Sequence, residues 1–276
     1  MESGRSIGLG PEVHSLLNRG DLDGALNLVE KGINENPGDF YLYTLLAEAS
    51  EKVGIDKAIE VYHRGLVHHP NNRHLNLGVG FLYYRKKDFR NAEKYLLGAW
   101  IEDPTNVRLL TVLGKIFNSY RQFEKAIKYF EIAALIEPDN TYAVYGLANS
   151  YRGVRDNGTA LKYWLKFHEL EPRNKIAITR IGDCYLVMED FDQALSYYSK
   201  ALEIGYDFYA LVGSARVHVK LQDYAKALEI YQMMAGREKG NYRYYNELAA
   251  YWEQVGDSEQ ADKVRERAAA LSKSWK

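Results

Sequence analysis

The sequence repeats itself with a period of about 34 residues, and this feature constrains the fold more than any other. Five of the six prolines recur at this period, and an alanine stands twelve positions before each of them. These prolines are Pro37, Pro70, Pro104, Pro138 and Pro172. The alanine series extends beyond the last of these prolines and comprises Ala25, Ala58, Ala92, Ala126, Ala160, Ala194, Ala227 and Ala261. Eight copies of one small unit therefore account for nearly the whole chain.

Each unit has the pattern of two amphipathic helices joined by a turn. In the fourth unit, Leu110, Leu113 and Phe117 share one face of a first helix, and Ala126 and Phe130 share one face of a second. Proline suits the turn that closes a unit because it cannot continue a helix. A glycine or alanine, twelve positions before most of the repeat alanines, lets the two helices approach closely, and aromatic side chains fill the gaps nearby.

With these positions in register, the sequence resembles the tetratricopeptide repeat family over roughly residues 6–275. Stretches such as 123–130 and 201–203 are similar to the second helix of that family. The resemblance implies an all-α fold, a right-handed α-solenoid of about eight helix-turn-helix repeats whose first helices line a concave groove. We expect a flexible segment at residues 1–10 and one solenoid domain at 11–276, with its last helix as a cap. The repeats are expected at about 6–38, 39–72, 73–106, 107–140, 141–174, 175–207, 208–241 and 242–275.

Composition and charge exclude several classes of function. Lys and Arg number 36 and Asp and Glu number 37, so the net charge of −1 gives no support for non-specific nucleic-acid binding. No run approaches the roughly 18 apolar residues that would span a bilayer. Residues 1–11 show no secretory signal, and a single cysteine, Cys184, excludes an intramolecular disulfide and a cysteine-built metal site. We therefore expect a cytoplasmic protein without membrane insertion.

No motif indicates catalysis. The chain has no Gly-rich phosphate loop, no metal-ligand helix pair and no nucleophile elbow. His68, His69 and His74 could bring imidazoles together, but they flank a turn, and we interpret them as the solvated end of a helix. Cys184 is expected to be a packed, inert thiol. We therefore expect no enzyme, no cofactor and no metal.

The candidate binding surface lies on the first helices, at the positions eighteen, fifteen, eleven and eight before each repeat alanine. In the tetratricopeptide repeat family this face points into the groove. Over units two to eight these positions hold five Lys or Arg, two Asp or Glu, and seven Tyr or Phe. Arginine pairs with carboxylates and tyrosine offers rigid contact area, so the surface suits an extended peptide with acidic and apolar side chains. The candidate partner-binding residues are Tyr84, Arg108, Lys115, Asn118, Tyr142, Tyr145, Asn149, Arg152, Arg180, Asp183, Tyr209 and Arg216.

The predicted function is a non-catalytic protein–protein interaction scaffold or adaptor that binds a peptide or a partner protein in the groove. One alternative is self-assembly into a homo-oligomer, which the degenerate first unit favours. A second alternative is single-stranded RNA binding, as in the related pentatricopeptide repeats, and the charge balance and the length of the repeat period disfavour it. The lysine and asparagine set with which some tetratricopeptide domains bind chaperone C-terminal carboxylates is incomplete here, so that ligand is disfavoured.

Overall fold

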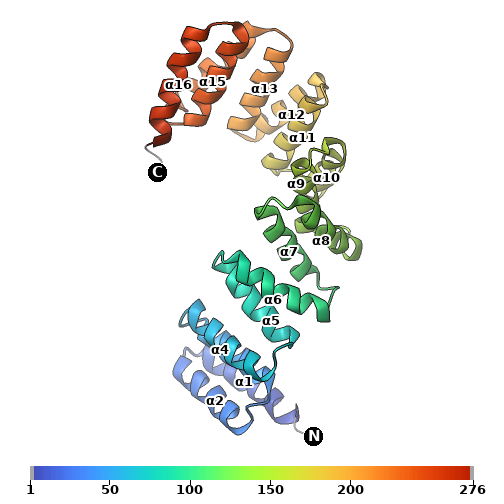
Figure 1. Cartoon of the computed structure of the whole chain (residues 1–276), viewed down its shortest axis with the longest axis vertical. Helices are drawn as coiled ribbons and strands as arrows, with labels where there is room; N and C mark the ends of the chain where they lie inside the picture. The colour runs from blue at the N-terminus through green and yellow to red at the C-terminus, as the bar shows by residue number, and fades with distance from the viewer. Residues whose placement is uncertain (1–2, 274–276) are drawn as a thin grey trace. The chain divides into compact units, whose positions relative to one another are not determined.

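The computed structural model describes residues 3–273, with side chains from residue 8 onward. In this range the chain forms sixteen α-helices and no strand, and the helices follow one another as eight pairs (Figure 1). Within a repeat the first helix packs on the second, as α5 does on α6 and α11 on α12. The predicted all-α repeat solenoid is confirmed.

The chain divides into two compact parts, residues 1–146 and 147–276, which we call the first and second unit from here on. The copies of about 34 residues are called repeats. The helices of the first unit are α1 (Ser3–Asn18), α2 (Leu22–Glu35), α3 (Phe40–Ser50), α4 (Ile55–His68), α5 (Arg73–Arg85), α6 (Phe89–Glu102), α7 (Val107–Ser119) and α8 (Phe123–Ile136). The boundary falls within α9 (Thr141–Gly153). The helices of the second unit are α10 (Asn157–Leu170), α11 (Lys175–Val187), α12 (Phe191–Ile204), α13 (Phe208–Lys220), α14 (Tyr224–Ala235), α15 (Tyr242–Val255) and α16 (Ser258–Lys273). The single domain expected at 11–276 stays a prediction.

The flexible segment expected at residues 1–10 overlaps the first helix. The backbone is helical from Ser3, and α1 continues through Pro11 to Asn18. Met1 and Glu2 lie outside the described residues. The mobility of this segment therefore stays a prediction, while residues 3–10 take helical rather than irregular backbone.

The turn inside each repeat combines a left-handed residue with a helix cap. The residue at the fifth position before the repeat alanine often adopts a positive φ, even where it has a long side chain, as Arg121 (59°) and Lys87 (62°) do. The next residue is usually an aspartate that caps the second helix, as Asp88 does by accepting a hydrogen bond of 3.1 Å from the backbone N–H of Asn91. Gln122 occupies this position before α8 and makes no such bond. The turn is therefore specified locally, repeat by repeat.

The core of each unit is built from large side chains that face glycines. Phe130 on α8 is fully buried, and a Cβ on Gly114 or Gly146 would lie only 2.6 or 2.4 Å from its ring. Tyr198 on α12 faces Gly182 and Gly213 in the same way, at 2.6 and 2.3 Å. A methyl group at any of these positions would overlap a ring. The small residue of the repeat is therefore required by packing, and the burial predicted for the second-helix aromatics is confirmed.

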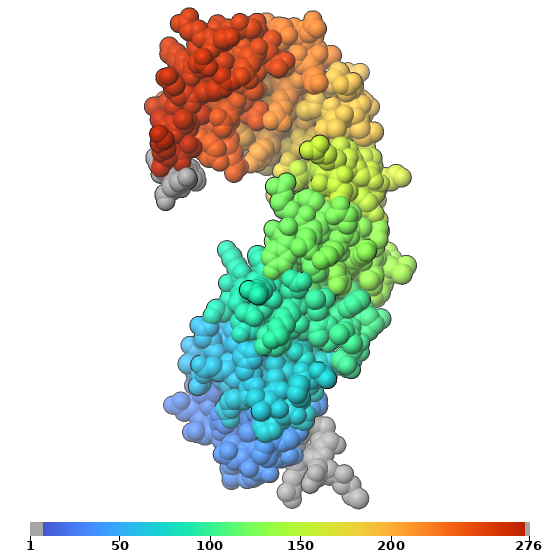
Figure 2. Space-filling model, viewed as in Figure 1, coloured from blue at the N-terminus to red at the C-terminus, as the bar shows by residue number. Residues whose placement is uncertain are grey.

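The last helix leaves most of its surface to water. Only Ala261 and Ala268 of α16 are buried. Arg265, which stands where other repeats have an apolar group, bonds the carboxylate of Asp262 at 2.8 Å and pairs with Glu253 on α15. In the space-filling view this helix forms the surface at the C-terminal end of the second unit (Figure 2). A helix with these side chains suits the end of a repeat array, whose outer face has no further repeat to cover it.

Candidate binding site

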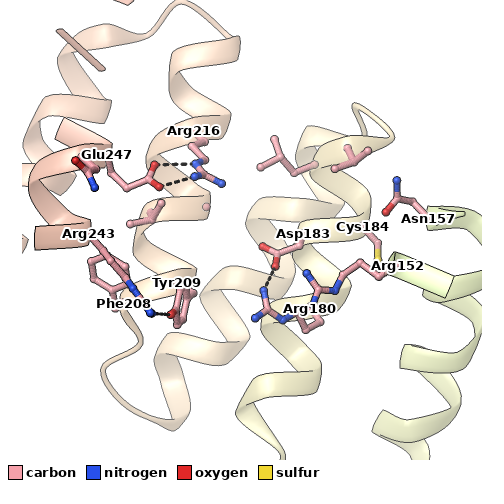
Figure 3. Close-up of a pocket in the computed structure, with 15 residues that line it drawn as sticks. Arg152, Asn157, Arg180, Asp183, Cys184, Phe208, Tyr209, Arg216, Arg243 and Glu247 are labelled. Carbon is pink, nitrogen blue, oxygen red and sulfur yellow. Dashed lines mark hydrogen bonds and ion pairs between the residues drawn. The ribbon is translucent and has the colours of Figure 1, made fainter. Parts of the chain in front are cut away.

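A hollow of about 440 Å³ opens on the first helices of the second unit (Figure 3). Its walls come mainly from α11, α13 and α15, with further side chains from α9 and α10. We call it the arginine hollow, because four of its lining residues are arginines: Arg152, Arg180, Arg216 and Arg243. Two carboxylates, Asp183 and Glu247, also line it. The volume lies within the range of sites that bind small molecules or side chains.

Asp183 accepts hydrogen bonds from two side chains on different helices. The Arg180 guanidinium, one turn earlier on α11, donates to Oδ2 at 2.7 Å, and the Tyr198 hydroxyl on α12 donates to Oδ1 at 3.0 Å. Burial, together with the negative charge of Asp183, raises the pKa of Tyr198, so this hydroxyl keeps its proton. The ring of Tyr198 is held in the core, so its hydroxyl fixes the Asp183 carboxylate, and this carboxylate in turn positions Arg180.

Arg216 and Glu247 form a planar, two-bond ion pair between α13 and α15. Nε of Arg216 donates to Oε2 at 3.0 Å, and Nη2 donates to Oε1 at 2.6 Å. The same two residues also line a second hollow of about 710 Å³, whose other walls include Leu186, Val187 and Val219. The ion pair therefore lies where the arginine hollow and the second hollow share a wall.

Tyr209 lies between two arginines that come from the helices on either side of α13. Nη1 of Arg243 donates to its hydroxyl at 2.6 Å, and the Arg180 guanidinium lies 5.6 Å from its ring centroid. Tyr209 is 44% exposed, so part of the residue remains open to a ligand. Figure 3 shows Arg243 and Tyr209 on one side of the hollow and Arg180 with Arg152 on the other.

In the first unit, the cations predicted to bind a partner contact aromatic rings of neighbouring first helices. The Arg108 guanidinium lies 4.3 Å from the ring centroid of Phe81, and Nζ of Lys115 lies 4.1 Å from that of Tyr142. Burial lowers the pKa of Lys115 below its ordinary value. Tyr84 packs against Phe89. These cations thus lie over aromatic rings of the chain itself.

The structure brings five of the twelve predicted residues together. The five that line the arginine hollow are Arg152, Arg180, Asp183, Tyr209 and Arg216. The others lie elsewhere on first helices, and Asn118, Tyr145 and Asn149 among them are half-buried. The seven residues outside the hollow are Tyr84, Arg108, Lys115, Asn118, Tyr142 and Tyr145 in the first unit and Asn149 in the second. The partner-binding role of all twelve residues stays a prediction.

Two charged residues that line the arginine hollow, Arg243 and Glu247, are not among the predicted ones. Arg243 occupies the first position of the predicted surface in the eighth repeat. Glu247 and Arg180 share one position of the repeat, the fourteenth before the repeat alanine. The same position holds glycine in other repeats, at Gly78, Gly146 and Gly213. A charge where other repeats have glycine is a signal that could have identified Glu247.

The remaining sequence candidates have local contacts. A ring nitrogen of His69 lies 2.7 Å from the carbonyl oxygen of Gly38, and His74 stacks on Phe40. Cys184 is buried in the wall of the arginine hollow, and burial raises the pKa of its thiol to about 11. Within the described residues, no three His, Cys, Asp or Glu side chains are grouped to hold a metal ion. None of the helices described there is both long enough and apolar enough to cross a bilayer.

Comparison with known proteins agrees with the fold. Residues 179–243 match the tetratricopeptide repeat family. Similar solved structures include YrrB, a tetratricopeptide repeat protein with an unusual peptide-binding site (23% identity, TM-score 0.62, covering 66% of this chain and 95% of its own). A tetratricopeptide repeat protein from Parabacteroides merdae (15%, 0.57, covering 96% and 100%) and MamA from Desulfovibrio magneticus (17%, 0.56, covering 60% and 94%) are also similar. The sequence matches no curated protein.

Proposed function

We propose that the chain, a member of the tetratricopeptide repeat family, is a protein-interaction module that binds an acidic segment of a partner protein in its second unit. One observation carries the proposal: arginines from four successive first helices line one hollow. Each of them occupies a different position of its repeat, so the repeat period alone does not bring them together. The peptide-binding site named for YrrB supports a similar use of this fold.

The chemistry of the arginine hollow suits an extended segment. Guanidinium groups donate paired hydrogen bonds to a carboxylate, and such charge-assisted bonds are about twice as strong as neutral ones. Phe208 and Val212 add apolar side chains to the lining. The second hollow, which shares the wall at Arg216 and Glu247, offers room for an apolar side chain further along the segment. This chemistry needs no catalytic group and no cofactor.

The predicted residues outside the arginine hollow are proposed as further contacts for the partner. In the first unit, Tyr142 is 62% exposed although Lys115 lies over its ring. Exposed aromatic surface beside a cation can pack against apolar side chains and bond carboxylates. The proposed compartment is the cytoplasm.

The experiment that tests this function measures the binding of short acidic peptides by fluorescence anisotropy. The double variant Arg216→Glu with Arg243→Glu should weaken binding by about 10-fold or more, because it replaces attraction with repulsion. A matched control is Lys162→Glu with Lys200→Glu, which changes two exposed lysines on the second helices α10 and α12. Absence of binding to acidic peptides, or equal loss in both double variants, would refute the proposal.

A further inference from the structure

The arginine hollow holds more positive charge than one carboxylate can neutralise. Its lining contains four arginines and two carboxylates, Asp183 and Glu247, whereas the whole chain carries a net charge of −1. The hollow thus has an excess of positive charge that the chain as a whole lacks. A carboxylate brings one negative charge, and a phosphate monoester brings about 1.5 to 2 at pH 7. The charge of the hollow is matched by the phosphate monoester.

The two carboxylates of the hollow already bind arginines. Asp183 accepts from Arg180, and Glu247 accepts from Arg216 through two bonds. Arg243, by contrast, bonds the hydroxyl of Tyr209 and not a carboxylate of the hollow. Two of the arginines therefore already bond carboxylates of the chain, and a carboxylate of a ligand would compete for the same donors. An anion with more charge and more acceptor oxygens would form stronger hydrogen bonds with these arginines.

The arrangement of the donors also favours a tetrahedral group. Arg180 on α11 and Arg243 on α15 both reach Tyr209 on the helix between them: Nη1 of Arg243 bonds its hydroxyl at 2.6 Å, and the Arg180 guanidinium lies 5.6 Å from its ring centroid (Figure 3). A carboxylate has two acceptor oxygens in one plane, whereas a phosphate monoester has three that point in different directions. Asp183 holds Arg180 in place and Tyr209 holds Arg243 in place before a ligand binds, which lowers the entropic cost of binding.

From this charge and geometry we propose that the arginine hollow binds a phosphorylated side chain of the partner segment. The inference rests on the proposed function and specifies its ligand. The second hollow supports a peptide as the carrier of the phosphate, because Leu186, Val187 and Val219 in its walls suit the apolar side chains of flanking residues. A polyanionic carrier such as nucleic acid is disfavoured by the net charge of the chain.

The test compares degenerate short peptides that carry phosphoserine, phosphothreonine or phosphotyrosine at the central position with the same peptides carrying the unmodified residue or glutamate. We expect at least one phosphorylated set to bind about 10-fold more tightly than its glutamate counterpart, and inorganic phosphate to compete with it. Equal or tighter binding of the glutamate peptides would overturn the inference and leave the proposed function standing. If no peptide binds, the proposed function fails as well.

One variant and its matched control test whether the phosphate binds in the arginine hollow. Arg243→Gln leaves the Arg180–Asp183 and Arg216–Glu247 pairs intact, so it should fold normally and reduce the preference for the phosphorylated peptide by about 10-fold. Arg173→Gln, at an exposed position in the turn before α11, is the matched control and should leave the preference unchanged. Circular dichroism and the thermal unfolding midpoint verify the fold of both. An unchanged preference in Arg243→Gln would overturn the inference.

Carriers other than a peptide are tested with the same protein. The probes are phosphatidylcholine vesicles containing phosphatidic acid, and an oligoribonucleotide with a terminal phosphate. Binding to either probe that exceeds the binding of every phosphopeptide would overturn the assignment of a protein partner. Binding of phosphopeptides alone supports it.

Discussion

The Arg216 guanidinium on α13 donates two hydrogen bonds to the Glu247 carboxylate on α15, at 3.0 and 2.6 Å. A carboxylate of the chain itself thus occupies an arginine that a ligand would use. Glu247→Gln should therefore raise the affinity for acidic or phosphorylated peptides, by about 3- to 10-fold, since it removes a competing negative charge. Fluorescence anisotropy measures the change. Weaker binding by this variant would show that Glu247 supports the ligand instead of competing with it.

The same substitution should have little effect on stability. The side chain of Arg216 is 55% exposed and that of Glu247 is 23% exposed, and pairs in such surroundings contribute about 0–1 kcal/mol. The thermal unfolding midpoint of Glu247→Gln should thus stay close to that of the parent. A large drop would mean that the pair stabilises the packing of α13 on α15.

Gln122 is a helix cap that can be improved. The residue at its position in the neighbouring repeats is Asp88 or Asp156, and each accepts a hydrogen bond from the first turn of its second helix. Gln122→Asp should stabilise the protein by about 1 kcal/mol, and Asp156→Ala should destabilise it. Urea unfolding followed by circular dichroism measures both. The interpretation of the turn fails if Gln122→Asp lowers the stability.

Gly182 faces the ring of Tyr198 in the core of the second unit. A Cβ there would lie 2.6 Å from the ring, so Gly182→Ala should destabilise the protein by about 1–3 kcal/mol through overpacking. Gly236→Ala is the matched control, because nothing lies within 4 Å of its Cβ position and its backbone is helical. It should be neutral or slightly stabilising. Equal stability of both variants in urea unfolding would contradict this packing.

The Cys184 thiol should react slowly in the folded protein. It is buried, and its pKa of about 11 leaves little thiolate, the reactive form, at pH 8. Labelling with a chromogenic disulfide should be slow in buffer and fast in denaturant. Rapid labelling of the native protein would show that the wall of the arginine hollow opens at α11.

His63 should make the first unit less stable at acid pH. Its two ring nitrogens lie 3.0 and 3.4 Å from the hydroxyls of Tyr83 and Tyr95, and burial lowers its pKa below 6.5. The unfolded chain then binds the proton more tightly, so this contribution to stability is complete above pH 6.5 and is lost as the pH falls further. The unfolding midpoint should decrease from neutral to acid pH, and His63→Gln should reduce the decrease. If the unfolding midpoint of His63→Gln decreases with pH as much as that of the parent, groups other than His63 cause the effect.

The spacing of residues along the chain was enough to predict the repeat and most of its core. The spacing of Ala126, Gly114 and Phe130 predicts two helices in close contact, and the structure confirms that Phe130 is buried against Gly114. This was predictable because a solenoid repeat is held by its own helix pair and its neighbours, so one short pattern specifies the same packing each time. The caps and left-handed turns are local for the same reason.

Which exposed residues line the arginine hollow could not be predicted from the repeat, because it depends on how the helices pack. Arg152, Arg180, Arg216 and Arg243 occupy four different positions of the repeat, and the way successive helices pack brings them to one hollow. Lys115 occupies the same position in its repeat as Arg216 and covers Tyr142 instead. Buried positions repeat because their packing repeats, whereas an exposed side chain takes its contacts from neighbours that differ in every repeat.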